Sequence, residues 1–265
     1  MTLTHVREGA GPPLLLVHGI GQSHHAWALT LPLLSPSREC VAVDLPGFGD
    51  SEPLDAAPTV PALAAACCEL MAELGFESFA VAGLSLGGAI ALELAATEAV
   101  TSACAVAPIG FVAAGWEQRY LQASLMATRA TVIALLPVAP VVTLWRWARK
   151  ALLAQLATHG ERVPPSLLLR GFFDLARARG FADTRRAALG WACPPSAAAG
   201  ASAPPRITVA WGDKDRLLLF GRQSRRARSR LPGATHVTLA DAGHLAPFDD
   251  PRAVAGAVLA ATASG

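Results

Sequence analysis

Short apolar runs alternate with helical patterns over the first part of the chain. The runs have the length and composition of buried strands, and they lie at 14–17, 41–43, 79–82 and 103–107. The sequence predicts helices between them, over 23–31, 59–74 and 86–96. Thr59 stands at an N-cap position and Gly75 follows the end of its helix. This alternation is typical of a mostly parallel central sheet flanked by helices, an α/β architecture.

The alternation stops after Pro108 and resumes near residue 206. Residues 110–200 have a mainly helical pattern broken by prolines, and 194–205 resemble a proline-rich return linker. The later strands are expected at 207–210 and 237–239, and the later helices at 221–231 and 251–261. We therefore divide the chain into a first core part, 1–109, a helical cap, 110–200, and a second core part, 201–265. Because ligands of open α/β sheets bind beyond the carboxyl ends of the strands, the cap is expected to cover the site.

Charge is divided unevenly along the chain. Hydrophobic residues make up 52% and charged residues 16%, which excludes a disordered chain. Residues 116–230 hold 19 of the 22 Lys and Arg but only 6 of the 20 Asp and Glu. One interpretation is a basic cap that docks an acidic carrier protein or an anionic lipid surface. The alternative is that arginine solvates a region rich in Ala and Leu. We expect no nucleic-acid partner.

The most apolar uncharged run, 130–145, is too short for a membrane span and contains Pro137 and Pro140, so no transmembrane segment is expected. The N-terminus lacks the pattern of a signal peptide. The five cysteines match neither a disulfide nor a zinc framework. These features together predict a cytoplasmic protein.

The most specific motif is Gly83-Leu84-Ser85-Leu86-Gly87, which follows a predicted strand and precedes a predicted helix. A sharp strand-to-helix turn strains the backbone at Ser85 and exposes its hydroxyl. Side chains two residues to either side would collide, so Gly83 and Gly87 leave the necessary room. The motif therefore predicts Ser85 as a catalytic nucleophile.

A serine nucleophile needs a base, an orienting acid and donors for the oxyanion. His244 lies just beyond the last predicted strand and is the candidate base. Asp213 and Asp215 follow another strand, and we prefer Asp215 as the acid because Asp213 can bond the backbone of its own turn. The backbone amides of Ile20 and Leu86 are the candidate oxyanion donors. This chemistry needs no metal and no cofactor.

Several segments together resemble the α/β-hydrolase superfamily, in its capped branch of small esterases, lactonases, C–C bond hydrolases and cofactor-free haloperoxidases. The matching segments are His18-Gly19-Ile20-Gly21 with Trp27, 44–51, 83–88, 212–215 and 243–244. The resemblance implies the α/β-hydrolase fold, an acid at Asp215 and a structural role for Asp44. The short N-terminus is expected to lack the family's first strand. Ser85 stands where haloalkane dehalogenases and epoxide hydrolases carry Asp, which disfavours those activities.

The expected activity is hydrolysis of a carboxylic ester, or a related lactone or thioester, of a hydrophobic acyl or aromatic small molecule. One alternative is a C–C bond hydrolase acting on a β-diketone or vinylogous ketone, since the same triad serves both. Another is a small-molecule receptor with little turnover. His24 and His25 are expected to be exposed on a helix, the alternative being that they line the entrance.

Overall fold

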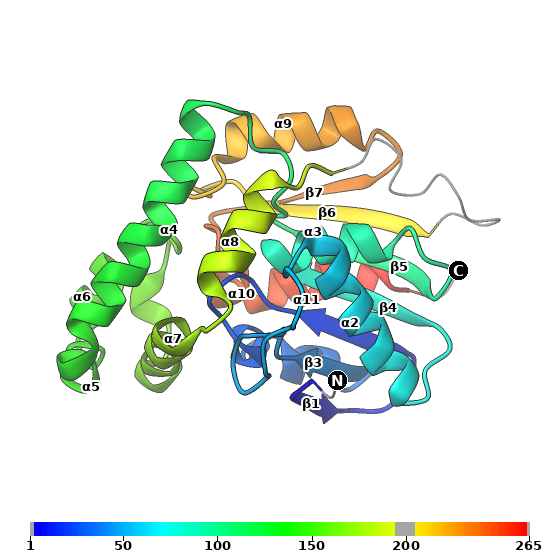
Figure 1. The fold of residues 1–265 in the computed structure, drawn as a ribbon, viewed down its shortest axis with the longest axis horizontal. Coiled ribbons are helices and arrows are strands. Elements are labelled where there is room, and N and C mark those ends of the chain that lie inside the picture. Colours follow the sequence, from blue (N-terminus) through cyan, green and yellow to red (C-terminus); the bar gives the residue numbers. More distant parts are fainter. Residues whose placement is uncertain (1–2, 194–204, 264–265) are drawn as a thin grey trace.

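The computed structural model describes residues 3–193 and 205–263, and its centre is a seven-stranded sheet flanked by helices (Figure 1). The strands are β1 (His5–Glu8), β2 (Pro13–Val17), β3 (Glu39–Val43), β4 (Phe79–Leu84), β5 (Val100–Val106), β6 (Arg206–Gly212) and β7 (Thr235–Leu239). Their order in the sheet is β1-β3-β2-β4-β5-β6-β7. β1 pairs antiparallel with β3, and the other pairings are parallel. The predicted fold class is confirmed.

A strand that the sequence analysis did not assign, β1, forms near the N-terminus, and whether the family's first strand is absent stays a prediction. β1 forms at the sheet edge, where Val6 lies opposite Ala42 of β3. The strand has four residues and its second half is exposed, so it carries too little apolar alternation to be seen in the sequence.

Helices cover both faces of the sheet. On one face α2 (Val60–Glu73), α3 (Leu86–Leu94) and α9 (Phe220–Arg230) pack into one buried cluster. On the other face α1 (Leu31–Leu34) and α11 (Pro251–Ala261) pack into a second cluster. Thr59 caps α2 by accepting a hydrogen bond from Ala62 N. The helix predicted over 23–31 is replaced by a short 3₁₀ turn, η1 (His24–Trp27), before α1 begins.

The cap lies between β5 and β6 and forms a layer on the left of Figure 1. Its elements are α4 (Trp116–Leu135), η2 (Leu136–Val138), α5 (Ala139–Val142), α6 (Arg146–Leu152), η3 (Gly160–Arg162), α7 (Pro165–Arg177) and α8 (Phe181–Gly190). The predicted linker at 194–205, apart from Pro205, and the predicted boundary at 200/201 lie outside the described residues.

Polar contacts join the cap to the core at both of its sides. On α4, the buried Glu117 forms an ion pair with Arg226 of α9, and Tyr120 donates a hydrogen bond of 2.7 Å to the carbonyl of Arg216. Near η3, Asp249 of α10 (Ala246–Asp249) accepts hydrogen bonds from cap backbone amides. The cap is therefore fixed over the carboxyl ends of the strands, where it can form a wall of a site.

α4 continues through η2 into α5, so the apolar run at 130–145 is part of a longer helical stretch. The stretch Trp116–Val142 is long and apolar enough to cross a membrane by length and composition, and only 6% of its most apolar window is buried. The argument that the run at 130–145 is too short to span a membrane therefore does not apply to the whole helical stretch, because that run does not include most of α4. The expected absence of a transmembrane segment and the expected cytoplasmic location stay predictions.

Candidate active site

Ser85 sits on a strained turn between β4 and α3. Its φ angle is 58°, a left-handed value that non-glycine residues rarely adopt. A Cβ added at Gly83 would lie 1.9 Å from the carbonyl oxygen of Gly87, and one added at Gly87 would lie 2.2 Å from that of Val17. The two glycines are therefore required by close backbone contacts, as the motif predicts.

His244 and Asp215 form a buried hydrogen-bonded pair, with 2.9 Å between His244 Nδ1 and Asp215 Oδ2. Asp215 Oδ2 also accepts from Trp211 Nε1 at 3.0 Å. Asp215 Oδ1 accepts from the amides of Leu217 and Leu218 at 2.9 and 2.8 Å. Both oxygens of the Asp215 carboxyl group therefore act as acceptors. Nδ1 of His244 is then the protonated nitrogen, which leaves Nε2 as the basic one.

Asp213, the other acid that the sequence offered, has different partners. Its Oδ1 accepts from Asp241 N at 2.8 Å and its Oδ2 lies 3.5 Å from Lys214 Nζ. It therefore stabilises its own turn and the neighbouring loop, while Asp215 contacts His244.

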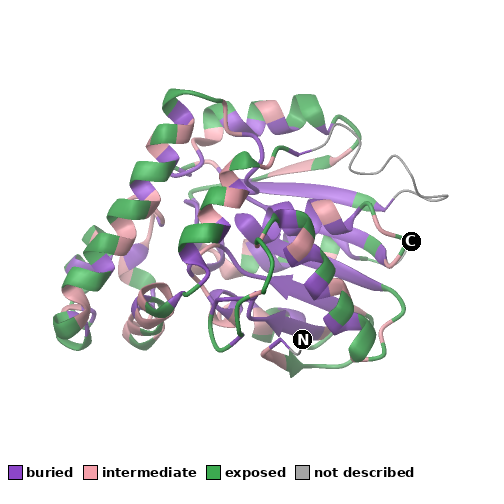
Figure 2. Ribbon diagram, in the orientation of Figure 1, coloured by how far each residue is buried: buried purple, intermediate pink, exposed green. Residues whose placement is uncertain are grey.

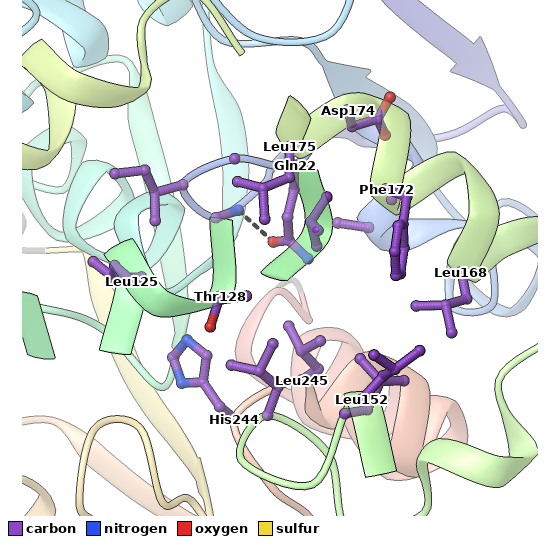
Figure 3. Close-up of a pocket in the computed structure, with 18 of the residues that line it drawn as sticks. Gln22, Leu125, Thr128, Leu152, Leu168, Phe172, Asp174, Leu175, His244 and Leu245 are labelled. Atoms are coloured by element: carbon purple, nitrogen blue, oxygen red, sulfur yellow. Dashed lines mark hydrogen bonds between the residues drawn. The ribbon is translucent and has the colours of Figure 1, made fainter. Parts of the chain in front are cut away.

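The loop after β2 is fixed by two side chains. Gln22 Oε1 accepts from Gly19 N at 3.0 Å, the bond drawn dashed in Figure 3. His18 Nε2 accepts from Leu45 N at 2.9 Å, so His18 Nδ1 donates to the carbonyl of Gly19 at 2.7 Å. Burial lowers the pKa of His18 to about 4, which keeps it neutral in this role. Because the Gly19 amide is engaged, Ile20 is the next amide of this loop available to an oxyanion.

Leu86 is the first residue of α3 and follows Ser85 directly. Its side chain is buried in the core, so only its backbone N–H can take part in a site. An N–H in the first turn of a helix has no partner within the helix, and the helix dipole there favours negative charge. The oxyanion roles of Ile20 and Leu86 stay predictions.

Ser85, His244 and Ile20 line one cavity of about 390 Å³. That volume lies within the range of small-molecule sites, about 300–1,000 Å³. Large apolar side chains from the cap form the facing wall (Figure 3), and they are Leu125, Leu152, Leu168, Phe172 and Leu175. The cap thus supplies an apolar surface opposite the polar residues of the core.

A second polar group lies across the cavity from His244 (Figure 3). Ser23 Oγ donates to Asp174 Oδ2 of α7 at 2.6 Å, so His25 Nδ1, 2.9 Å away, donates to Ser23 Oγ. Burial raises the pKa of Asp174 above its usual value. The sequence did not indicate this group. The expectation that His25 is exposed on a helix is wrong, because it lines the cavity from a 3₁₀ turn.

Asp44 has the structural role that the resemblance implies. Its carboxylate accepts from His24 N and Nδ1 at 2.7 and 2.9 Å and from Asp50 N at 3.0 Å. Burial alone would raise the pKa of Asp44, but these hydrogen bonds outweigh it and lower the pKa to about 2. His24 is thereby held against the β3 loop rather than exposed.

Asp249 supports the loop that carries His244. It accepts from Gly243 N at 2.7 Å, and from Thr158 N and His159 N of the cap at 2.9 and 2.7 Å. No sequence pattern marked Asp249, and the neighbouring Asp250 caps α11. The loop of His244 and the cap therefore share one anchoring carboxylate.

Over residues 3–193 and 205–263, no group of three or more His, Cys, Asp or Glu is arranged to hold a metal ion. The expectation that the protein uses no cofactor stays a prediction.

Comparison with known proteins places this chain in a family. Residues 14–257 match the model of the alpha/beta hydrolase family. The chain is 30% identical over 251 residues to the dihydrolipoyllysine-residue acetyltransferase component of the acetoin cleaving system of Cupriavidus necator, which covers 92% of this chain and 62% of that protein. The chain thus spans less than two thirds of that relative.

Two further proteins are similar. The 2-hydroxymuconate semialdehyde hydrolase of Pseudomonas sp. strain CF600 is 41% identical over 92 residues, 33% of this chain and 32% of that protein. The structure of the enol-lactonase from Burkholderia xenovorans LB400 superposes with a TM-score of 0.76 at 22% identity, covering 99% of this chain and 96% of that one. Because residues 14–257 match the family model, the chain belongs to the alpha/beta hydrolase family.

Proposed function

We propose that the protein is a serine hydrolase that cleaves a carboxylic ester of an apolar acyl or aromatic small molecule through an acyl-enzyme at Ser85. The observation that carries the proposal is the 2.9 Å hydrogen bond between His244 and Asp215, at a cavity that Ser85 also lines. Lactones and thioesters present the same acyl carbon and belong to the same proposal.

The proposed reaction depends on which nitrogen of His244 carries the proton. Nδ1 carries it, so Nε2 can act as the base. Nε2 of His244 removes the Ser85 proton as Oγ attacks the carbonyl carbon, and the backbone amides of Ile20 and Leu86 donate to the oxyanion. The ester C–O bond then breaks and His244 protonates the leaving alkoxide. Water, deprotonated by His244, attacks the acyl-enzyme and releases the acid. Asp215 holds the imidazole in place and stabilises its charged form.

The cavity favours an uncharged, apolar acyl group. Leucine and phenylalanine side chains of the cap would cover the acyl chain, whereas the partly buried Asp174 would repel a carboxylate at the far end of a substrate. Neutral esters of medium-chain or aromatic acids are therefore the preferred substrates, and a terminal carboxylate is expected to lower kcat/KM.

A fluorophosphonate probe combined with a panel of p-nitrophenyl esters tests the proposal. We expect one phosphonylated residue, identified as Ser85 by peptide mass spectrometry, and loss of labelling and turnover in Ser85→Ala. Ser229→Ala, which changes an exposed serine on α9, is the matched control and should keep both. Turnover retained in Ser85→Ala would show that another residue is the nucleophile.

Hydrolysis of a C–C bond is the second candidate, and the match to 2-hydroxymuconate semialdehyde hydrolase favours it. The same panel should therefore include a β-diketone and a vinylogous ketone. A higher kcat/KM for either of them than for every ester would replace the ester assignment. A compound that raises Tm without being turned over would instead favour the receptor alternative.

A further inference from the structure

Large apolar side chains point outward at one end of the cap. We call this surface the apolar tip, and it consists of Val138, Val141, Leu144, Trp145 and Trp147. Leu144 is 61% exposed and Trp147 68%, and the rings of Trp145 and Trp147 stack with their centroids 5.6 Å apart. Figure 2 shows exposed positions along the α5 and α6 end of the cap. Exposed apolar groups that adjoin one another mark interaction surfaces, unlike single exposed ones.

Packing within this chain does not explain the apolar tip. Over residues 139–149 the buried side chains are small or polar, and they are Ala139, Thr143, Ala148 and Arg149. Leucine and tryptophan would ordinarily take the inward positions, since burying them stabilises the fold most. Over residues 139–149 the large apolar side chains are thus exposed while small or polar ones are buried.

The outward orientation is held by a buried arginine. The guanidinium of Arg149 donates to the carbonyls of Thr143 and Leu144 at 2.9 and 2.8 Å, and to that of Glu161 at 2.9 Å. These bonds fix the turn between α5 and α6, from which Leu144 and Trp145 project. The apolar tip is therefore a built feature and not a loose segment.

Positive charge exceeds negative charge near the apolar tip, where Glu161 of η3 is the first acidic residue after Glu117. Residues 118–160 contain no Asp or Glu, while Arg146 and Lys150 are exposed on α6. Arg162, also exposed, lies on η3, which packs against α6. The complementary partner of this surface is therefore both apolar and anionic.

We propose that the apolar tip docks on the surface of an anionic lipid bilayer. Trp145 and Trp147 would lie at the headgroup level, where tryptophan is favoured, and Arg146 and Lys150 would contact lipid phosphates. A second copy of this chain would bring like charges face to face across a symmetric contact. An acidic protein recognised by charge alone would leave the five apolar side chains unexplained.

α4 is expected to lie along the membrane surface and not to cross the bilayer. Its N-terminal turn is tied to the core by the ion pair of Glu117 with Arg226. Its Thr128, Thr131 and Val132 line the active-site cavity, so a spanning α4 would remove a wall of that cavity. This docking proposal does not depend on the proposed hydrolysis, because lipid binding can be measured without turnover.

Cosedimentation with vesicles of phosphatidylcholine, with and without phosphatidylglycerol, tests the proposal in the full chain. The wild type should bind the anionic vesicles, with a blue shift of tryptophan emission and quenching by brominated lipid. Trp145→Ala with Trp147→Ala should lower the partition coefficient by at least about tenfold. Arg146→Gln with Lys150→Gln should lower it by about tenfold on anionic vesicles only.

The matched control is Arg225→Gln with Arg228→Gln, which removes two exposed charges from α9, at the top of Figure 1, whereas α5 and α6 lie at its lower left. Binding should be unchanged in this variant, and Tm in all variants should match the wild type. An equal loss of binding in the α9 variant, or a partition coefficient that the tryptophan substitutions leave unchanged, would overturn the proposal. So would absence of binding to both vesicles, a dimer that the tryptophan substitutions dissociate, or binding of an acidic acyl carrier protein in place of lipid.

Discussion

Replacing Asp215 by asparagine separates its proposed role from that of Asp213. The two oxygens of Asp215 accept four hydrogen bonds, from Trp211, Leu217, Leu218 and His244. Asparagine keeps the shape of the side chain but turns one acceptor into an NH₂ donor. Two of the four surrounding donors must then face another donor, whichever way the amide is turned.

The two orientations of the amide have different costs. If the NH₂ group faces Leu217 and Leu218, two buried amides lose their acceptor, at about 1–3 kcal/mol of unfolding free energy each. If it faces His244, the imidazole must accept at Nδ1, and Nε2 becomes protonated and cannot act as a base. In a well-studied Ser-His-Asp triad, the same Asp→Asn substitution gives the wrong imidazole tautomer and lowers kcat by about 10⁴. This factor is equivalent to about 5.5 kcal/mol of activation free energy. In both cases the charged imidazole loses its anionic partner.

We therefore expect Asp215→Asn to lower kcat on a p-nitrophenyl ester by about 10³–10⁴ and to lower the free energy of unfolding measurably. The control is Asp213→Asn, whose carboxylate contacts only Asp241 N and Lys214 among the hydrogen bonds and ion pairs of the described residues. It should change kcat by less than about threefold. Steady-state kinetics and urea denaturation of both variants provide the measurement. A larger loss of kcat in Asp213→Asn than in Asp215→Asn would refute the assignment of the acid.

Three more predictions concern residues that shape or support the site. Gly83→Ala should lower Tm sharply in thermal denaturation, because its Cβ would lie 1.9 Å from the Gly87 carbonyl oxygen. With a folded pKa of about 2 against an ordinary 3.8, Asp44 stabilises the fold above pH 4 and loses that contribution as the pH falls toward 2. Asp44→Asn should thus flatten acid denaturation between these values, removing about 2 kcal/mol of pH-dependent stability. Asp249→Ala should lower kcat and Tm together and speed hydrogen exchange at Gly243, whose amide it holds.

The parts of the molecule that short-range rules determine could be predicted from the sequence. The turn at Ser85 needs glycine at 83 and 87 for steric reasons that operate within a few residues, so the motif in its strand–turn–helix context was sufficient. The helix beginning at Val60 was predictable for the same reason, since Thr59 bonds an amide three residues on. β1 was missed because an edge strand of four residues owes its form to pairing with β3.

Residues whose partners lie far along the chain could not be predicted. Asp174 contacts Ser23 across 151 positions, and no local pattern marks either residue. Asp215 was preferred to Asp213 from the bonding that Asp213 can make in its own turn, but the contact of Asp215 with His244, 29 positions away, is visible only in the structure. In the sequence, His18 is part of a glycine-rich loop. Its hydrogen bond to the Gly19 carbonyl could not be predicted, because it depends on the amide of Leu45, which donates to the other ring nitrogen of His18.

α6 shows why the family of the chain could be predicted from the sequence while the exposed apolar surface of the cap could not. Trp147 points outward from this helix and Leu152 lines the cavity, so one apolar segment serves two surfaces. Composition gives the total hydrophobicity of the segment but not its division between these faces. A helical period could reveal the division, but α6 has seven residues and the prolines of η2 and α5 interrupt the pattern before it. Arg149 instead fixes which side chains face outward, because its hydrogen bonds to the carbonyls of Thr143 and Leu144 set the turn before α6. Such hydrogen bonds produce no periodic pattern of hydrophobic residues in the sequence.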